Sequence, residues 1–260
     1  MERLDRIVRV MEFVSQQGRE GASMNQIGYV LELPKASLYR LVADMEQAGL
    51  LIHNPRLNRY FLSWKVFEWA SAYYGQTSYV EILQEAINEL TQEVQLFSYA
   101  SVLQNGRLFS LAVATPRTFY PVYVKLGARV PLRASAPGKV LLAQNAAERV
   151  NSWLEQEEKE LGFWTPTPYT QSLESLKQEM PQISQQGWAL CRDELEIGNS
   201  ALAVPVGTPP SWVSLAVVAP TLVIADRTHE LLSALRKAAE TIASSMDVAR
   251  VIESGGGMAP

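Results

Sequence analysis

The 260-residue chain predicts an α+β protein with two domains. Three helical patterns and a β-hairpin pattern open the chain, and strand-rich runs later mix with longer helical patterns. The length is sufficient for two separate hydrophobic cores. We therefore expect a small helical domain with a hairpin, followed by a larger domain in which helices flank a mostly antiparallel sheet.

Composition narrows the cellular setting. A hydrophobic content of 47% and a charged content of 19% are typical of globular proteins, and no apolar run reaches the length of a membrane span. Residues 1–20 lack the continuous apolar stretch of a signal peptide. The single cysteine, Cys191, excludes an intrachain disulfide. We expect a cytoplasmic protein with no membrane partner.

Charge is distributed unevenly along the chain. The net charge is −4, yet residues 1–65 hold nine Lys and Arg against seven Asp and Glu. The remainder holds 14 basic and 20 acidic residues. For a nucleic-acid partner the distribution matters more than the sum, although this modest asymmetry does not identify a partner by itself.

The first 50 residues contain the signals of three helices. An apolar stripe from Leu4 to Val14 indicates the first helix, and the run "GREG" at 18–21 ends it. Ser23 is expected to cap the second helix, with Gln26 as its capping-box partner. Pro34 suits the first position of the third helix, and Gly49 suits the residue just beyond that helix. The third helix carries an apolar stripe formed by Leu38, Leu41, Val42 and Met45.

Two apolar runs follow, "LLIH" at 50–53 and "RYFLS" at 59–63, on either side of the basic segment "NPRLN". They predict a β-hairpin. A helix, a short helix, a tight turn, a longer helix and a hairpin, in this order, predict a winged helix-turn-helix over residues 1–62. In that fold the third helix enters the major groove of DNA.

The polar face of the third helix supports this interpretation. Lys35 and Arg40 place cations near the helix N-terminus, where the macrodipole disfavours them unless an anion lies close by. The alternative is a helical packing module with solvated polar residues. We expect Arg56 and Arg59 of the hairpin to reach the DNA backbone or minor groove. The candidate DNA-binding residues are Ser23, Asn25, Lys35, Ala36, Ser37, Tyr39, Arg40, Arg56, Asn58 and Arg59.

A connecting helix is expected over residues 63–76, capped by Ser63 and rich in aromatic side chains. Aromatic residues are enriched in protein interfaces, and DNA-binding helices usually work in symmetric pairs. The alternative is that these side chains pack on the first helix. The candidate dimer-interface residues are Val66, Phe67, Trp69, Tyr73 and Tyr74.

The rest of the chain predicts the larger domain. A helical stripe runs from Val80 to Val94, and Asn105-Gly106 is a strong signal for a hairpin turn. We expect a helix from "SAPGKVLLAQN" and mainly helical structure over 146–187, interrupted at Pro181. The other expected elements are strands at "YPVYVKLG", "ARVPLRA", 188–191, 200–206 and 212–220, a last helix from about Asp226 to Ile252, and a frayed tail at 254–260.

Three segments of the sequence carry a family resemblance: "LPKASLYRLVADMEQAGLL" with the later "RYFLS", "LGARVPLRASAPGKVLLA" at 126–143, and "GWALCRDELEIGNSALAVPV" at 187–206. Together they resemble the IclR family of bacterial transcriptional regulators. The resemblance covers nearly the whole chain. It implies a GAF-like effector-binding domain over 77–253 and a dimer, or a dimer of dimers, on palindromic operator DNA. It also implies a small-molecule effector, often a carboxylate or an aromatic acid, and no cofactor.

The resemblance also implies an effector site. One wall is the helix start at "ASAPGK", where free backbone N–H groups suit an anion, although Pro137 removes one donor. This chain has Cys191 where many family members have an acidic residue, and Ala201 where many have cysteine or serine. Ala216 and Val218 stand near positions where members that bind small oxoacids carry serine. The candidate effector-binding residues are Leu132, Ala136, Gly138, Lys139, Cys191, Asp193, Ala201, Ala216 and Val218.

These departures suggest a cavity more apolar than is usual in the family. An unmatched charge in an apolar cavity costs several kcal/mol. The hypothesis is that the domain binds a hydrophobic or aromatic ligand, or has lost ligand sensing. The alternative for all these residues is plain core packing.

The sequence gives little support to an enzymatic function. His53 and His229 fall in different expected domains, neither has a metal-ligand spacing, and no metal site is expected. The phosphate-loop pattern and the G-x-S-x-G elbow are both absent from the sequence. An enzyme that uses the thiol of Cys191 is a second alternative, although no histidine is expected near that thiol. A further alternative is a DNA-binding protein whose larger domain only assembles oligomers.

Overall fold

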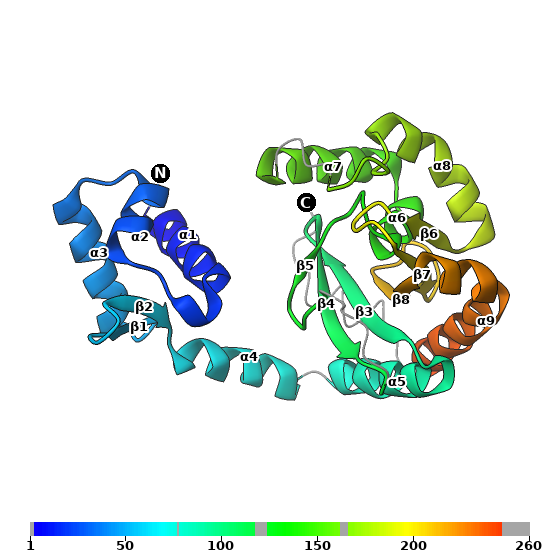
Figure 1. Cartoon of the computed structure of the whole chain (residues 1–260), viewed down its shortest axis with the longest axis horizontal. Helices are drawn as coiled ribbons and strands as arrows, with labels where there is room; N and C mark the ends of the chain where they lie inside the picture. Colours follow the sequence, from blue (N-terminus) through cyan, green and yellow to red (C-terminus); the bar gives the residue numbers. More distant parts are fainter. Residues whose placement is uncertain (1–2, 77, 118–123, 162–165, 246–260) are drawn as a thin grey trace. The chain divides into compact units, whose positions relative to one another are not determined.

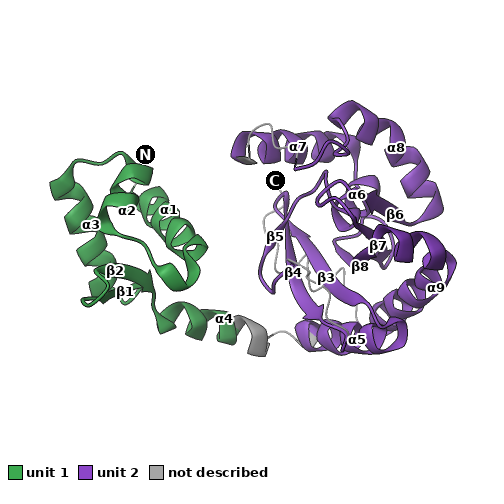
Figure 2. Ribbon diagram, in the orientation of Figure 1, with its two compact units in different colours: residues 1–77 green, residues 78–260 purple. Residues whose placement is uncertain are grey.

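The computed structural model describes residues 3–76, 78–117, 124–161 and 166–245, with the backbone alone at 73–76, 78 and 161. The chain divides into two compact units, residues 1–77 and residues 78–260 (Figure 2). Each unit has its own hydrophobic core. Together they form an α+β fold, as the sequence predicts.

The first unit is a winged helix-turn-helix (Figure 1). Its core contains the stripe Leu38, Leu41, Val42 and Met45, packed against Val10, Val14, Ile27 and Leu31. The predicted order of helices and hairpin is confirmed. The elements are α1 Arg3–Gln16, the short 3₁₀ helix η1 Gly18–Glu20, α2 Met24–Leu31, α3 Lys35–Gln47, β1 Leu51–Asn54, β2 Arg59–Leu62 and α4 Trp64–Gln76.

Local signals set the ends of these helices. Ser23 and Gln26 form the predicted capping box, and Gly49 follows α3 with the expected positive φ of 75°. Pro34 is the N-cap of α3 and not its first helical residue. Its ψ of 141° is extended, and its carbonyl accepts the hydrogen bond from Leu38 N at 3.0 Å that opens the helix.

The wing is joined to the segment before α2 by backbone hydrogen bonds. Strands β1 and β2 pair antiparallel, with Leu51 opposite Leu62. Ala22 then bridges to Tyr60, with N···O distances of 2.9 and 2.8 Å in the two directions. The hairpin is therefore continuous with the helix-turn-helix through main-chain contacts as well as through the core.

The second unit is built on a six-stranded sheet with the order β5-β4-β3-β8-β7-β6, in which every neighbouring pair is antiparallel. Its elements are α5 Ser78–Val94, β3 Phe97–Gln104, β4 Arg107–Ala114, β5 Arg129–Val130, α6 Ala136–Ala143, α7 Ala147–Leu161, α8 Leu173–Gln186, β6 Ala189–Arg192, β7 Asn199–Val206, β8 Val213–Pro220 and α9 Thr221–Ser245.

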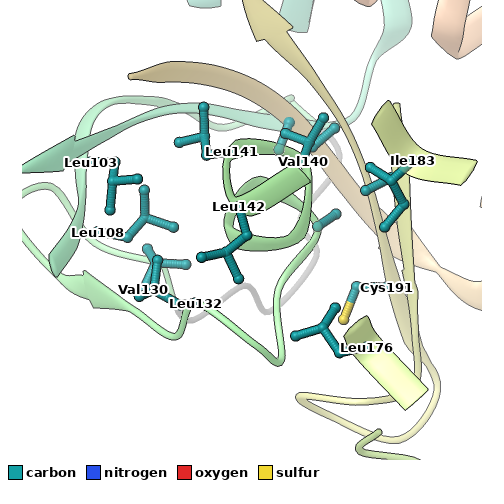
Figure 3. Packing of buried hydrophobic residues seen from close by; sticks show 14 of the residues in the cluster. Leu103, Leu108, Val130, Leu132, Val140, Leu141, Leu142, Leu176, Ile183 and Cys191 are labelled. Carbon is teal, nitrogen blue, oxygen red and sulfur yellow. The ribbon is translucent and has the colours of Figure 1, made fainter. Parts of the chain in front are cut away.

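Helices cover both faces of this sheet (Figure 1). The helices α5 and α9 pack together on one face, and α6 packs on the other face together with α8. Figure 3 shows the core around α6, with Leu103 and Leu108 on one side of the helix and Ile183 and Cys191 on the other. Every residue of α6 from Ala136 to Leu142 is buried, so this helix is a central element of the second core.

Two expected strands are wrong or much shorter than predicted. "ARVPLRA" forms only the two-residue strand β5, because Pro131 has no N–H to continue the ladder. The described part of "YPVYVKLG", Val124–Gly127, is a turn and irregular chain, and residues 120–123 lie outside the described residues.

Two helix boundaries also differ from the prediction. Pro181 lies inside α8 and does not interrupt it, and the proline is on the exposed side of the helix. There the carbonyl that loses its backbone donor can bind water. The last helix begins at Thr221 rather than Asp226, because Ile224 is buried against the core and packing outweighs the local strand preference. Its expected end at Ile252 and the tail at 254–260 lie outside the described residues.

No helix in the described ranges is both long enough and apolar enough to span a membrane.

Candidate functional site

The N-terminal half of α3 presents its polar side chains to solvent. Lys35, Ser37 and Arg40 are exposed, Ala36 is exposed beside them, and the side chain of Tyr39 is 58% exposed. Leu38 and Leu41, on the opposite side of the same turns, are buried. The helix therefore offers basic and hydroxyl groups to a partner while its apolar stripe holds it to the unit.

The cations on this surface are not neutralised. Within the described ranges, Lys35, Arg40 and Arg56 form no ion pair. Arg56 is exposed at the tip of the wing, where Asn54 Oδ1 accepts hydrogen bonds from Arg56 N at 3.1 Å and from Leu57 N at 3.2 Å. These bonds order the tip backbone, so Arg56 extends from a defined turn.

The other predicted wing residues are engaged with the protein itself. Asn58 adopts the left-handed region with a φ of 52°, and its Oδ1 lies 3.2 Å from Nε2 of His53. Arg59 begins β2 rather than lying at the tip, and its Nη1 donates to Gln26 Oε1 at 2.5 Å. Gln26 was not among the predicted site residues, although its place in the capping box is visible in the sequence. It joins the wing to the first turn of α2.

Two predicted residues of α2 complete this surface. Ser23 is partly buried, and its side chain is committed to the capping box with Gln26. Asn25 is exposed in the first turn of α2. Asn25 is therefore available to a partner, whereas Ser23 shapes the helix end.

The second unit contains a cavity of about 400 Å³ between the inner face of the sheet and the chain before α6. Its size is in the range of cavities that hold small molecules. Three of the predicted effector-binding residues, Cys191, Ala201 and Val218, contribute to its wall. The remaining lining residues are Tyr99, Val124, Ala128, Arg129, Val130, Pro131, Ala134, Ser135, Leu195, Glu196, Asn199 and Ser200.

Six of the predicted effector-binding residues are not in the cavity wall. Asp193 has a φ of 57° and uses its Oδ1 to accept hydrogen bonds from Gly198 N at 2.7 Å and Thr221 Oγ1 at 2.9 Å, which closes a turn. Lys139 is fully buried and forms ion pairs with Glu194 at 2.5 Å and Glu179 at 3.5 Å. The other four, Leu132, Ala136, Gly138 and Ala216, are buried in the core.

The start of α6 differs from the expected anion site. Gly138 N donates to Ser135 Oγ at 3.1 Å, and Lys139 N donates to Ser135 O at 3.0 Å. Pro137 has no N–H to offer. The amides expected to meet an anion are therefore largely occupied by the helix cap itself.

Tyr99 is the main cavity residue that sequence reasoning missed. It lies on β3 directly opposite Ala216 of β8, so the register places it on the same face as the predicted residues. Burial raises the pKa of its phenol, and the nearby Cys191 raises it further. Tyr99 therefore stays protonated, and its hydroxyl remains a neutral hydrogen-bond donor.

Cys191 is not set up as a nucleophile. Burial raises the pKa of its thiol to about 12, with a further contribution from Glu194 that outweighs the opposing effect of Lys139. The thiol donates to the Ala134 carbonyl at 3.1 Å. The thiolate is the reactive form, and it is scarce at neutral pH. Among the described residues no cluster of His, Cys, Asp and Glu could hold a metal ion.

The connecting helix α4 exposes large aromatic side chains. The exposed fractions are 62% for Phe67 and 55% for Trp69, while Val66 is partly buried. Lys65 Nζ lies 5.7 Å from the centre of the Trp69 ring. The side chains of Tyr73 and Tyr74, predicted for the same interface, lie outside the described residues.

Comparison with known proteins gives matches along nearly the whole chain. "HTH-type transcriptional regulator XynR" of Escherichia coli is 26% identical over 85% of this chain and 86% of its own. "Pca operon regulatory protein" of Acinetobacter baylyi is 29% identical over 73% of this chain and 69% of its own. The crystal structure of an IclR homolog from Microbacterium hydrocarbonoxydans, complexed with 4-hydroxybenzoate, is 22% identical with a TM-score of 0.77, covering 94% of this chain and 98% of that one.

Two family profiles account for the two units. The profile described as the IclR helix-turn-helix domain matches residues 3–55. The profile described as the bacterial transcriptional regulator IclR C-terminal domain matches residues 71–244, well over half of the chain. The protein therefore belongs to the IclR family of DNA-binding bacterial transcriptional regulators.

Proposed function

We propose that this regulator binds a palindromic operator as a dimer or a dimer of dimers, under the control of a hydrophobic or aromatic effector in the second unit. The exposed polar surface at the start of α3 carries the proposal, because its cations have no internal partner among the described residues. One α3 would read each half-site in the major groove, and the wing would set register on phosphates.

The dimer would use the exposed aromatic side chains of α4. Phe67 and Trp69 expose most of their surface, and contacts between copies would remove that apolar area from water. Effector binding would shift the population of dimer arrangements and so change the spacing of the two α3 helices. Such a shift requires the effector to bind one arrangement more tightly than the other.

The cavity supports an apolar effector. Val130, Ala201, Val218 and other small or aliphatic residues form most of its wall. The relative from Microbacterium hydrocarbonoxydans was crystallised with 4-hydroxybenzoate, an aromatic compound, which supports a ligand of that shape. The protonated thiol of Cys191 favours a binding function over catalysis in this cavity.

We expect alanine substitution of two arginines to affect DNA binding in different ways. Arg40→Ala should weaken operator binding by about 1–3 kcal/mol and relax the base preference, because Arg40 is assigned to base edges. Arg56→Ala should weaken binding to all DNA alike and reduce the salt dependence by about one phosphate contact. Fluorescence anisotropy with operator and scrambled duplexes, over a range of salt concentrations, measures both effects.

Arg59→Ala provides the matched control on the same wing. Because one nitrogen of the Arg59 guanidinium is held by Gln26, the loss of Arg59 should lower the slope of affinity against salt less than the loss of Arg56 does. Wild-type affinity and selectivity in the Arg40→Ala protein would contradict its assigned role. A reduction of the salt slope in Arg59→Ala as large as that in Arg56→Ala would show that Arg59 contacts phosphate equally.

Calorimetric titration tests the apolar cavity. We expect glyoxylate and pyruvate not to bind, because a small carboxylate would leave its charge poorly matched in this cavity. Members of a panel of small aromatic compounds should bind and raise the melting temperature. Micromolar binding of glyoxylate or pyruvate would refute the proposal. No response to any compound, with operator affinity unchanged, would favour a second unit that serves oligomerisation alone.

A further inference from the structure

We propose that the cavity selects an uncharged ligand and that the hydroxyl of Tyr99 orients it through a hydrogen bond. This inference rests on the proposed function, since it assumes that the cavity holds the effector. It specifies the charge of the ligand and names the group that recognises it. The ligand would be a compact apolar molecule with one neutral polar group.

The cation in the described cavity wall is already paired. Arg129 Nη1 lies 2.5 Å from Glu160 Oε2, and Arg107 Nη2 lies 2.8 Å from Glu160 Oε1. Burial alone would raise the pKa of Glu160, but hydrogen bonds from Arg107, Gln156 and Arg129 hold it at about 2. Glu160 is therefore ionised at neutral pH, and a ligand carboxylate would have to compete with it for Arg129.

The other groups expected to receive an anion are also largely occupied. Lys139 is committed to Glu194 and Glu179, and the amides of Gly138 and Lys139 are committed to Ser135. The wall itself contains the carboxylate of Glu196, which accepts a hydrogen bond from Asn199 Nδ2 at 3.0 Å. The negative charge of Glu196 would disfavour a ligand carboxylate bound nearby. The electrostatics of the cavity therefore favour a neutral ligand.

Tyr99 supplies the polar contact. Its side chain is only 2% exposed and lines the cavity, yet its hydroxyl has no hydrogen-bond partner among the described residues. The other buried polar groups of the wall are satisfied internally: Cys191 donates to Ala134 O, Ser135 donates to Pro131 O, and Ser200 pairs with Thr221. A hydroxyl that lines a mostly apolar cavity and has no bond to the protein can donate its hydrogen bond to a ligand in that cavity.

Three probes of similar size test the inference on the full-length protein at pH 7.5. They are p-cresol, which is neutral with a polar group, benzoate, which is an anion, and toluene, which is apolar. We expect p-cresol to bind at least tenfold more tightly than benzoate in a calorimetric or NMR titration. Tyr99→Phe should weaken p-cresol roughly three- to tenfold, the effect of one lost hydrogen bond, and leave toluene unchanged.

The outcomes separate this inference from the proposed function. Binding of benzoate as tight as that of p-cresol would overturn the neutral-ligand inference while an effector cavity remains. Unchanged p-cresol affinity in Tyr99→Phe would overturn the role of Tyr99. Failure of all three probes would overturn both the inference and the proposed aromatic effector. Phenylalanine keeps the ring of tyrosine and removes only the hydroxyl group. An unchanged affinity for toluene would show that the packing of the cavity is intact in Tyr99→Phe.

Discussion

Replacing Gly138 with alanine is expected to destabilise the second unit by about 3 kcal/mol or more, at the upper end of overpacking effects. A Cβ at this position would lie 2.0 Å from the backbone oxygen of Leu132. The Leu132 backbone cannot easily yield, because its N–H donates to the buried carboxylate of Glu157 at 2.6 Å. Relief of the clash would displace either α6 or the chain that precedes it.

Urea unfolding followed by tryptophan fluorescence measures this effect. Gly127→Ala is the matched control, since Gly127 has a φ of +74° and no neighbouring atom within 4 Å of a Cβ. The free energy of unfolding of Gly127→Ala should fall only by the cost of a left-handed conformation for alanine, about 1–2 kcal/mol. Equal losses in the two variants would show that the space beside Leu132 opens without strain.

Replacing Lys139 with methionine is expected to lower the free energy of unfolding of the second unit by about 3–5 kcal/mol. This is the range for removing one partner of a buried ion pair. Methionine fills most of the volume of the fully buried lysine stem, but it leaves Glu194 buried without its main cation. Lys139→Met/Glu194→Leu is the matched double variant. It should recover most of the loss, because no uncompensated charge remains.

The loss of stability in Lys139→Met should also depend on pH. Burial already raises the pKa of Glu194 above 4.5, and Lys139 is the largest influence that lowers it. Without Lys139 that pKa rises further, so the folded variant retains a proton that the unfolded chain releases. The contribution of Glu194 to the stability of the variant is then fully present below pH 4.5 and is lost as pH rises through the raised pKa. Urea unfolding should show a larger deficit at pH 8 than at pH 5, and a constant deficit would contradict this account.

Local backbone requirements explain why much of the fold could be predicted from sequence. Ser23 and Gln26 form a capping box within one turn, and Asn105 and Gly106 both adopt positive φ in the hairpin turn. Such signals depend on a few neighbouring residues. The expected strand at 128–134 was too long because Pro131 has no N–H to continue the ladder, and the expected break at Pro181 was wrong because this proline lies on the exposed side of α8.

The two candidate sites differ in how far the sequence reveals them. The exposed face of α3 follows from helical periodicity alone, so its residues could be selected without a structure. The cavity depends on which residues of distant strands lie opposite one another. Tyr99 faces Ala216 only through the register of β3 and β8. Lys139 resembles a ligand-binding residue until its partner Glu194, 55 positions away in the chain, is seen to neutralise it.

The main-chain bridge between Ala22 and Tyr60, together with the hydrogen bond from Arg59 to Gln26, joins the wing to the start of α2, and α2 packs with α3 in the core of the first unit. In the proposed DNA complex, the distance between the groove that receives α3 and the phosphates beneath the wing would then be limited by these contacts. A misfit along that distance would have to be absorbed by bending or narrowing of the duplex. The regulator would then discriminate among operators partly by how easily their flanking base steps deform, at positions that no side chain touches.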